Sequence, residues 1–186
     1  MRFSIKMRIN FFQEIEIPEG VSVELHKDIL KVKGSQGENE RHLVLRGLEF
    51  KIDGKKIIFG CKKTTKKEKK RINTMKAHIA NLIGGVNEKY EYKLKACFVH
   101  FPVTLEHKGH EVIIKNFLGE KTPRKAKIPK GAEVKIEKDI IKVTSTNKEI
   151  AGQAAANLET ATKIRKRDRR VFQDGIFITS KCGEEI

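Results

Sequence analysis

The sequence contains no tryptophan, two tyrosines and ten phenylalanines, so aromatic residues make up only 6% of its 186 residues. A protein that binds single-stranded nucleic acid mainly by base stacking needs several exposed aromatic platforms, and this composition argues against that class. Cysteine is also scarce. Cys61, Cys97 and Cys182 are odd in number and widely spaced, which argues against a disulfide framework and a paired-cysteine zinc knuckle. We expect the three thiols to be reduced, as in an intracellular protein.

Long hydrophobic runs are absent as well. The first residues, "MRFSIKMRINFF", contain no apolar run of seven or more followed by a small-residue cleavage site, and no window approaches 18 apolar residues. The basic segments lack an adjoining amphipathic helix with large apolar side chains, which binding at a membrane surface requires. We therefore expect a cytoplasmic protein without a membrane partner.

Signatures of catalysis and of cofactor binding are also missing. The sequence has no GxxxxGK[ST] phosphate loop, and "GSQG" at residues 34–37 is interpreted as a turn. His107 and His110 flank a glycine turn, but no further ligands are placed to complete a zinc site, so exposed loop histidines are the favoured interpretation. We expect no enzymatic activity, no metal and no cofactor. A nucleic-acid-processing enzyme with a basic cleft stays open as the alternative.

Cys97 and His100 form the one candidate nucleophile pair. We expect them on a strand whose neighbours Phe98 and Phe101 belong to the core. A cysteine–histidine nucleophile needs a third group that orients the histidine, and the sequence offers none nearby.

The most informative feature that is present is an internal repeat. The segment "IPEGVSVELHKDILKV" at residues 17–32 recurs as "IPKGAEVKIEKDIIKV" at residues 128–143, with nine of sixteen positions identical at a constant offset of 111. Each copy has an alternating run, a polar Lys-Asp corner and a second alternating run. This pattern predicts a β-hairpin with one buried face.

Each hairpin is accompanied by a predicted helix. Thr65 and Glu68 form a capping box, and an apolar stripe follows at helical spacing until Gly84 and Gly85, which we expect to end the helix. The stripe consists of Ile72, Met75, Ile79, Leu82 and Ile83. The second helix begins near Asn147 and carries a stripe of Ile150, Ala154, Leu158 and Ala161. Further antiparallel strands are expected between the two copies.

These elements predict an α+β fold with two tandem homologous domains, each an antiparallel sheet packed on one helix, and a basic C-terminal tail. We expect an extension over residues 1–12, the first domain over 13–87, the second over 88–165, and a tail with a short strand over 166–186. One large domain with a chance recurrence is the alternative. It is disfavoured because nine identities at one offset rarely arise by accident.

The positive charge is concentrated in three segments. Residues 62–71, 121–130 and 163–170 contain 18 cations and two acids, which accounts for the whole formal net charge of +16. Charge focused in this way indicates contact surfaces for a polyanion such as nucleic acid. In the first segment the candidate RNA-binding residues are Lys62, Lys63, Lys66, Lys67, Lys69, Lys70 and Arg71. Several of them occupy the first turns of a helix, where free N–H groups favour phosphate. The alternative is a solvated lysine-rich face.

The last segment, "KIRKRDRR", is rich in arginine, whose planar guanidinium can donate two parallel hydrogen bonds to a phosphate. We expect Asp168 to orient neighbouring arginines rather than to act as an acid. Phe172, Ile176 and Phe177 are expected to anchor the segment on the protein body. A frayed tail is the alternative.

Several motifs resemble one known family. They are "NFLGEK" at residues 116–121 with "PRKAKI" after it, "KAHIANLIGGV" at 76–86 leading to "YKLK" and "HFPV", and above all "KRDRRVFQDGIF" at 166–177. Together they resemble the large-ribosomal-subunit protein six family in its archaeal and eukaryotic form. The resemblance covers residues 13–181 in the family's order and spacing.

This resemblance implies two homologous α+β domains and a structural role in the large ribosomal subunit. It implies binding to large-subunit ribosomal RNA close to the factor-binding region, at the base of the lateral stalk and near the sarcin-ricin loop. Neighbouring ribosomal proteins would be partners, and translation factors would pass nearby. Carried over by position, RNA contact is expected at Lys163, Arg165, Lys166, Arg167, Arg169 and Arg170, and at the loop around Asn116, Gly119, Lys121 and Arg124. The basic residues Lys125 and Lys127 that follow this loop are further RNA-binding candidates. Residues 62–71 depart most from the family pattern.

Overall fold

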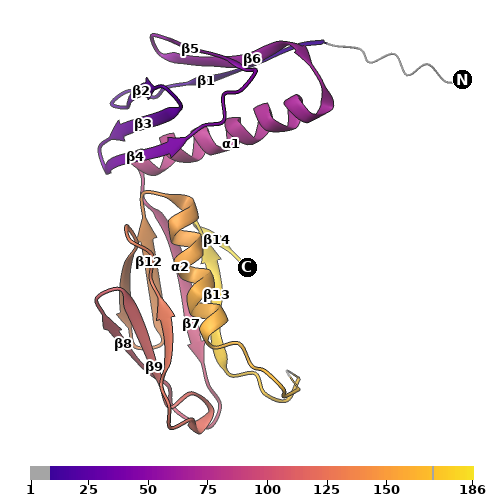
Figure 1. Cartoon of the computed structure of the whole chain (residues 1–186). Helices are drawn as coiled ribbons and strands as arrows, with labels where there is room; N and C mark the ends of the chain where they lie inside the picture. Colours follow the sequence, from indigo (N-terminus) through magenta and orange to yellow (C-terminus); the bar gives the residue numbers. More distant parts are fainter. Residues whose placement is uncertain (1–8, 169) are drawn as a thin grey trace, which may run out of the picture. The chain divides into compact units, whose positions relative to one another are not determined.

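The computed structural model describes residues 9–168 and 170–186. The chain divides into two compact units, residues 1–88 and residues 89–186, and each unit has its own hydrophobic core (Figure 1). The α+β class and the tandem arrangement predicted from the sequence are confirmed. Within the described residues, no helix is both long enough and apolar enough to cross a membrane.

The first unit consists of two three-stranded antiparallel sheets and one helix. One sheet has the order β1-β6-β5 and the other the order β2-β3-β4. The strands are β1 (Ile9–Glu16), β2 (Ser22–His26), β3 (Ile29–Gly34), β4 (Gly37–His42), β5 (Glu49–Asp53) and β6 (Lys56–Thr64). Helix α1 (Lys66–Asn87) packs against strands of both sheets. Phe59, Ile57 and Leu30 are fully buried in the core between them.

Helix α1 begins where the sequence predicted. The backbone N–H of Thr65 donates to the Glu68 carboxylate at 2.5 Å, which completes the capping box, and the whole predicted apolar stripe is buried. The prediction that the helix ends at Gly84 and Gly85 is wrong, because the helix continues to Asn87. Its last turn is held by tertiary contacts, because the Val86 side chain is fully buried and its carbonyl accepts a hydrogen bond from the Gln36 N–H.

The second unit contains a larger sheet, a smaller sheet and one helix. The larger sheet has the order β11-β12-β7-β13-β14 and the smaller one the order β10-β9-β8. The strands are β7 (Tyr90–Cys97), β8 (Thr104–Lys108), β9 (Glu111–Lys115), β10 (Arg124–Lys127), β11 (Glu133–Glu137), β12 (Ile140–Ser145), β13 (Gly175–Lys181) and β14 (Glu184–Glu185). A single 3-10 turn, η1 (Phe117–Gly119), separates β9 from β10.

Helix α2 (Lys148–Ala161) lies on the larger sheet of the second unit (Figure 1). The Asn147 side chain accepts a hydrogen bond from the Glu149 N–H at 2.9 Å, so the predicted start of this helix is confirmed. The buried face of the helix carries three alanines and Leu158, all without solvent exposure. Such small side chains let the helix backbone approach the sheet closely.

The two units correspond strand by strand in chain order. In both, the first strand pairs with the sixth and the sixth with the fifth, the second to fourth strands form the other sheet, and the helix follows the sixth strand. The repeated hairpin, however, is β2-β3 in the first unit and β11-β12 in the second, which are not equivalent positions. The 111-residue offset is therefore not the offset of the duplication, although the two-domain conclusion holds.

The reason for the misleading repeat is that each unit contains two similar hairpins. The hairpins β2-β3, β5-β6, β8-β9 and β11-β12 all close with a two-residue turn. The first residue of each turn has a positive φ between 53° and 60°; these residues are Lys27, Gly54, Gly109 and Lys138. The four hairpins thus share one turn geometry, and two of them, β2-β3 and β11-β12, also have similar sequences.

The segment after α2 is a closed loop rather than a free tail. After the basic residues the chain returns as β13, which pairs antiparallel with β7 inside the sheet. Ile176 is 1% exposed in this strand, whereas Phe177, also expected as an anchor, is 44% exposed. At the other end of the chain, residues 9–12, expected in an extension, belong to β1 and pair with β6.

Candidate nucleic-acid interface

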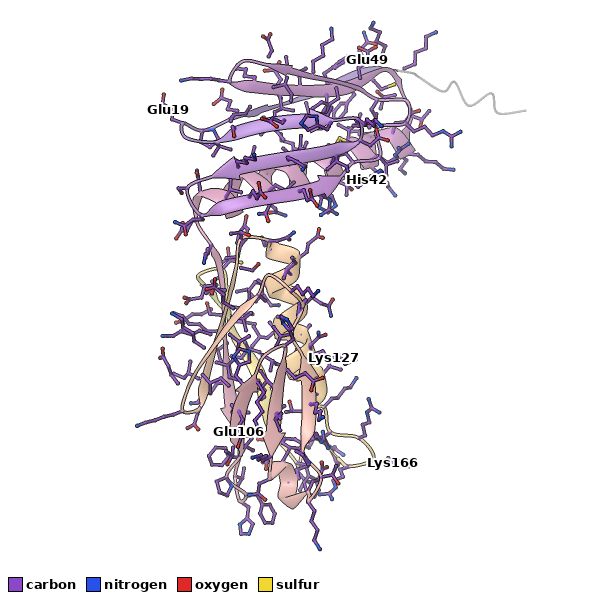
Figure 2. All side chains as sticks on the ribbon, turned by 60° about the vertical axis from the view of Figure 1, so that its left-hand side comes forward. Glu19, His42, Glu49, Glu106, Lys127 and Lys166 are labelled. Carbon is purple, nitrogen blue, oxygen red and sulfur yellow. The ribbon has the colours of Figure 1, made fainter. Side chains whose placement is uncertain are left out.

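Three loops meet at one end of the second unit. They are the aromatic loop (residues 98–103, between β7 and β8), the turn loop (residues 116–123, around η1) and the basic loop (residues 162–174, between α2 and β13). Figure 2 shows this end at the bottom of the view, with the labelled Lys166 on the right and several ring side chains on the left. Two of the three basic segments predicted from the sequence therefore converge here, although they are about 40 residues apart in the chain.

Arg124 joins the turn loop to the basic loop. Its guanidinium donates to both oxygens of the Glu120 carboxylate, at 2.6 and 2.8 Å, and Nη1 donates to the carbonyls of Ala161 and Lys163, at 3.1 and 3.3 Å. The same group lies 4.4 Å from the ring centroid of the buried Phe117. A cation at the carboxyl end of α2 is also favoured by the helix dipole. Arg124 thus uses its donors within the protein and fixes the start of the basic loop.

The Arg124 contact changes the acidity of its partner. The hydrogen bond from Arg124 lowers the pKa of Glu120 below its ordinary value, and the nearby charge of Arg167 acts in the same direction. Glu120 is therefore ionised at neutral pH and paired, so it presents no free negative charge to an approaching phosphate.

The basic loop is ordered by contacts of its own. The guanidinium of Arg167 lies 4.8 Å from the ring centroid of Phe172. The Asp168 carboxylate accepts hydrogen bonds from the Arg170 side chain and from its backbone N–H, both at 2.9 Å, and these bonds lower the pKa of Asp168. Asp168 thus orients the side chain of Arg170, in line with the role expected for it from the sequence. Arg169 lies outside the described residues.

A basic groove of about 650 Å³ runs between β10 and the end of α2. Its cationic lining combines Arg124, Lys125 and Lys127 with Lys163 and Arg165. Apart from Arg124, these side chains are exposed. Asn157 donates to the Lys127 carbonyl at 2.8 Å and so ties the strand to the helix. The groove offers several cations on a rigid frame, which suits a phosphate backbone more than a small neutral ligand.

The remaining predicted residues of the turn loop have different positions. Lys121 is exposed. Asn116 donates from Nδ2 to the Pro102 carbonyl at 3.0 Å, and so holds the aromatic loop. Gly119 has a φ of +73°, and a Cβ atom there would lie 3.2 Å from the Phe101 ring. Asn116 and Gly119 therefore shape the surface, while Lys121 contributes charge to it.

The third basic segment belongs to the first unit, where it spans the end of β6 and the first turns of α1. Lys62 pairs with Glu49 at 3.3 Å, Lys69 lies 5.1 Å from the Phe11 ring centroid, and Arg71 donates to the Val44 carbonyl. The other four cations of this segment are exposed: Lys63, Lys66, Lys67 and Lys70. Glu68 already occupies the Thr65 N–H at the helix start. This surface offers point charges rather than a shaped site.

The prediction that Cys97 and His100 lie on one strand is wrong. Cys97 ends β7 and is half-buried, but His100 lies in the aromatic loop rather than on a strand. Phe98 and Phe101 are 36% and 40% exposed, so they do not belong to the core. Pro102 could have indicated from the sequence that the strand ends before this segment, because proline disfavours the continuation of an inner strand. Within residues 9–168 and 170–186, no three His, Cys, Asp or Glu side chains lie together in a metal-binding group.

Sequence comparison defines the class of protein to which this architecture belongs. The profile of the family described as Ribosomal protein L6 matches the chain twice, over residues 17–89 and 101–175. The two matches start at equivalent places in the two units, before β2 and before β8. This agrees with the strand correspondence derived above.

Two archaeal relatives extend the match to nearly the whole chain. The chain is 44% identical over 174 residues to the "Large ribosomal subunit protein uL6" of Methanococcus vannielii, covering 94% of this chain and 96% of the relative. It is 44% identical over 169 residues to the protein of the same description from Methanobrevibacter smithii, covering 91% and 95%. Two matched units and this coverage define a ribosomal protein. The chain belongs to the ribosomal protein L6 family.

Membership of this family bears out the archaeal-eukaryotic resemblance stated from the sequence motifs. It also agrees with the expectation that the chain is not an enzyme, because ribosomal protein L6 is a structural family.

Proposed function

We propose that this chain is a structural constituent of the large ribosomal subunit and binds large-subunit ribosomal RNA through the loop end of its second unit. The observation that carries the proposal is the basic groove, where cations from two distant segments line one surface. Phosphate contacts of this kind supply affinity and fix position without reading sequence. Both archaeal relatives are described as large-subunit proteins, and their lengths match this chain.

The residues proposed to contact RNA fall into three groups. In the groove and the turn loop they are Lys121, Lys125, Lys127, Lys163 and Arg165, and in the rest of the basic loop Lys166, Arg167 and Arg170, with Arg169 as a prediction from sequence alone. Arg124, Asn116 and Gly119 hold these loops in shape. The exposed lysines at the start of α1, in the first unit, form the third group.

Within the subunit, we propose a position near the factor-binding region, at the base of the lateral stalk. The support is the motif at residues 166–177, which covers most of the basic loop and the start of β13. Neighbouring ribosomal proteins would adjoin the chain there, and translation factors would pass nearby. The chain would then be located in cytoplasmic ribosomes.

Sucrose-gradient fractionation tests this proposal. A tagged chain is expected to sediment with large subunits and to stay with them after a high-salt wash. Ultraviolet crosslinking of the recovered particles is expected to join the basic loop to ribosomal RNA of the factor-binding region. The proposal fails if the chain stays at the top of the gradient while large subunits sediment without it. Crosslinks confined to another RNA region would leave the assembly role intact and remove the proposed position.

A further inference from the structure

The aromatic loop exposes apolar side chains at the end of the second unit that carries the basic groove. Phe98 is 36% exposed, Val99 85% and Phe101 40%. In the described part of the chain, this is the one place where three large hydrophobic side chains among four consecutive residues are exposed. Exposed apolar side chains that gather in this way usually mark a contact surface.

The loop is held rigidly in this exposed position. The Val99 N–H donates to Oδ1 of Asp174 at 3.2 Å, and Asp174 itself is only 6% exposed. On the other side, Asn116 donates to the Pro102 carbonyl at 3.0 Å. The loop is therefore fixed by a residue from each of the two neighbouring loops. Its exposed rings belong to an ordered loop and not to a frayed segment.

The rings are also fixed relative to each other and to the turn loop. The rings of His100 and Phe101 meet edge to face, with centroids 4.7 Å apart. The Phe101 ring lies against Gly119, where any side chain would crowd it. A ring that is already ordered loses little conformational freedom when it stacks on a partner, which favours binding.

The charges around the loop indicate what the rings would meet. Asp174, which contacts the aromatic loop, is the last residue of the basic loop. Gly119, which lies against the Phe101 ring, is two positions before the exposed Lys121 of the turn loop. The carboxylates of this end are engaged, because Glu120 is paired with Arg124 and Asp168 with Arg170. An apolar surface whose two neighbouring loops carry exposed cations suits an RNA segment with unpaired bases, whose phosphates would meet the cations while its bases stack on the rings.

We propose that Phe98 and Phe101 stack on unpaired bases of ribosomal RNA, and that His100 holds the Phe101 ring in place for this contact. The inference rests on the proposed RNA-binding function and adds base contact to it. It does not make the chain a stacking module in the sense excluded by its composition, since only two of its ten phenylalanines are involved. The phosphate contacts would provide most of the affinity, and the rings would select a loop or a bulge over a regular duplex.

Paired RNA probes test the proposal with the full-length chain. One probe is an RNA stem-loop with an eight-nucleotide loop of mixed sequence, and the other is a duplex with the same number of phosphates. The double change Phe98→Leu and Phe101→Leu keeps apolar volume but removes the rings. It is expected to lower affinity for the stem-loop by about tenfold or more. Affinity for the duplex and the salt dependence of binding are expected to stay unchanged.

Phe12→Leu is the matched control. Phe12 is 40% exposed on β1 of the first unit, like Phe101, but lies outside the three loops, and its replacement is expected to leave both affinities unchanged. Irradiated large subunits give a second readout, because a base stacked on Phe98 or Phe101 is expected to yield a nucleotide adduct on the peptide containing residues 98–101.

Other outcomes overturn the stacking proposal. Equal loss of affinity for both probes, or no loss for either, would show that the rings make no base contact. If the double leucine variant binds both probes normally but Phe98→Asp no longer enters large subunits, the loop docks on a neighbouring protein instead. A wild-type chain that binds neither probe and does not sediment with large subunits contradicts the RNA-binding function itself, which separates the two failures.

Discussion

At the scale of single residues, two arginines of the second unit have opposite roles although both lie in basic segments. Arg124 directs its donors inward, to Glu120 and to the carbonyls at the end of α2. Arg170 is held by Asp168 but remains largely exposed, with 91% of its side chain accessible. Burial and hydrogen bonding, and not residue type, therefore separate a residue that positions the interface from one that can contact a phosphate.

The Glu120–Arg124 pair leads to a pH-dependent prediction. Because the folded-state pKa of Glu120 is lowered, the stabilisation by the pair is present above the unfolded carboxyl pKa and is lost as pH falls through the folded value. Glu120→Gln is expected to lower the melting temperature at pH 7, and this deficit should shrink as the pH is lowered below about 4.

Thermal unfolding of both proteins between pH 7 and pH 3 measures the effect. Glu184→Gln, at an exposed position of β14 in the same unit, serves as a control for the loss of one carboxylate. A melting-temperature deficit for Glu120→Gln that stays constant down to pH 3 would contradict this account of the pair.

At the scale of elements, the basic loop is a connection with both ends fixed. It leaves α2, whose carboxyl end is bound by Arg124, and it enters β13, which pairs with β7. Inside the loop, Thr162 contributes a further restraint, because its hydroxyl oxygen accepts a hydrogen bond from the Ile176 N–H at 2.9 Å. A loop restrained in this way presents its cations without the entropic cost of ordering a free tail.

The loop cations should dominate the salt dependence of RNA binding. If the six cations of residues 163–170 each neutralise one phosphate, replacing all six with glutamine should flatten the slope of log affinity against log salt by about 4 to 5. Binding of the full-length chain to a large-subunit RNA fragment at several salt concentrations measures this slope.

A variant with the same change in charge provides the control. Six exposed lysines of the first-unit hairpins can be replaced by glutamine: Lys27, Lys31, Lys33, Lys51, Lys55 and Lys56. This control is expected to change the slope far less. Similar flattening by the two variants would mean that net charge, and not the basic loop, determines binding.

At the scale of the whole molecule, the chain has two separate cores. Phe59 is fully buried in the first unit and Leu158 in the second, and each belongs to a cluster confined to its own unit. The cationic groove and the aromatic loop lie in the second unit alone. Stability and RNA contact can therefore be perturbed in one unit at a time.

Core truncations test this independence. Phe59→Ala is expected to cost about 3 to 5 kcal/mol and Leu158→Ala about 2 to 5 kcal/mol, through lost burial and the cavity left behind. Amide hydrogen exchange should accelerate in β3, β6 and α1 for the first change, and in β7, β12 and α2 for the second. Loss of protection across both units from either single change would show that the chain unfolds as one cooperative body.

Local patterns in the sequence predicted the class of the fold and much of its detail. The α1 stripe was predicted residue by residue, because helical spacing and a capping box depend on neighbours a few positions apart. Alternation predicted the β2-β3 and β11-β12 hairpins for the same reason. It could not predict which sheet each hairpin joins, since four hairpins share one turn geometry, and so the 111-residue repeat was assigned the wrong correspondence.

The sequence by itself determined the two-unit α+β fold, the concentration of charge and the family, because these depend on composition, short-range spacing and motifs. Only the tertiary structure decided which charges meet. It brought β10 and the basic loop together across about 40 residues, turned Arg124 inward and left Phe98 and Phe101 exposed. The physical reason is that exposure and hydrogen bonding are set by packing between distant segments, which local sequence does not encode.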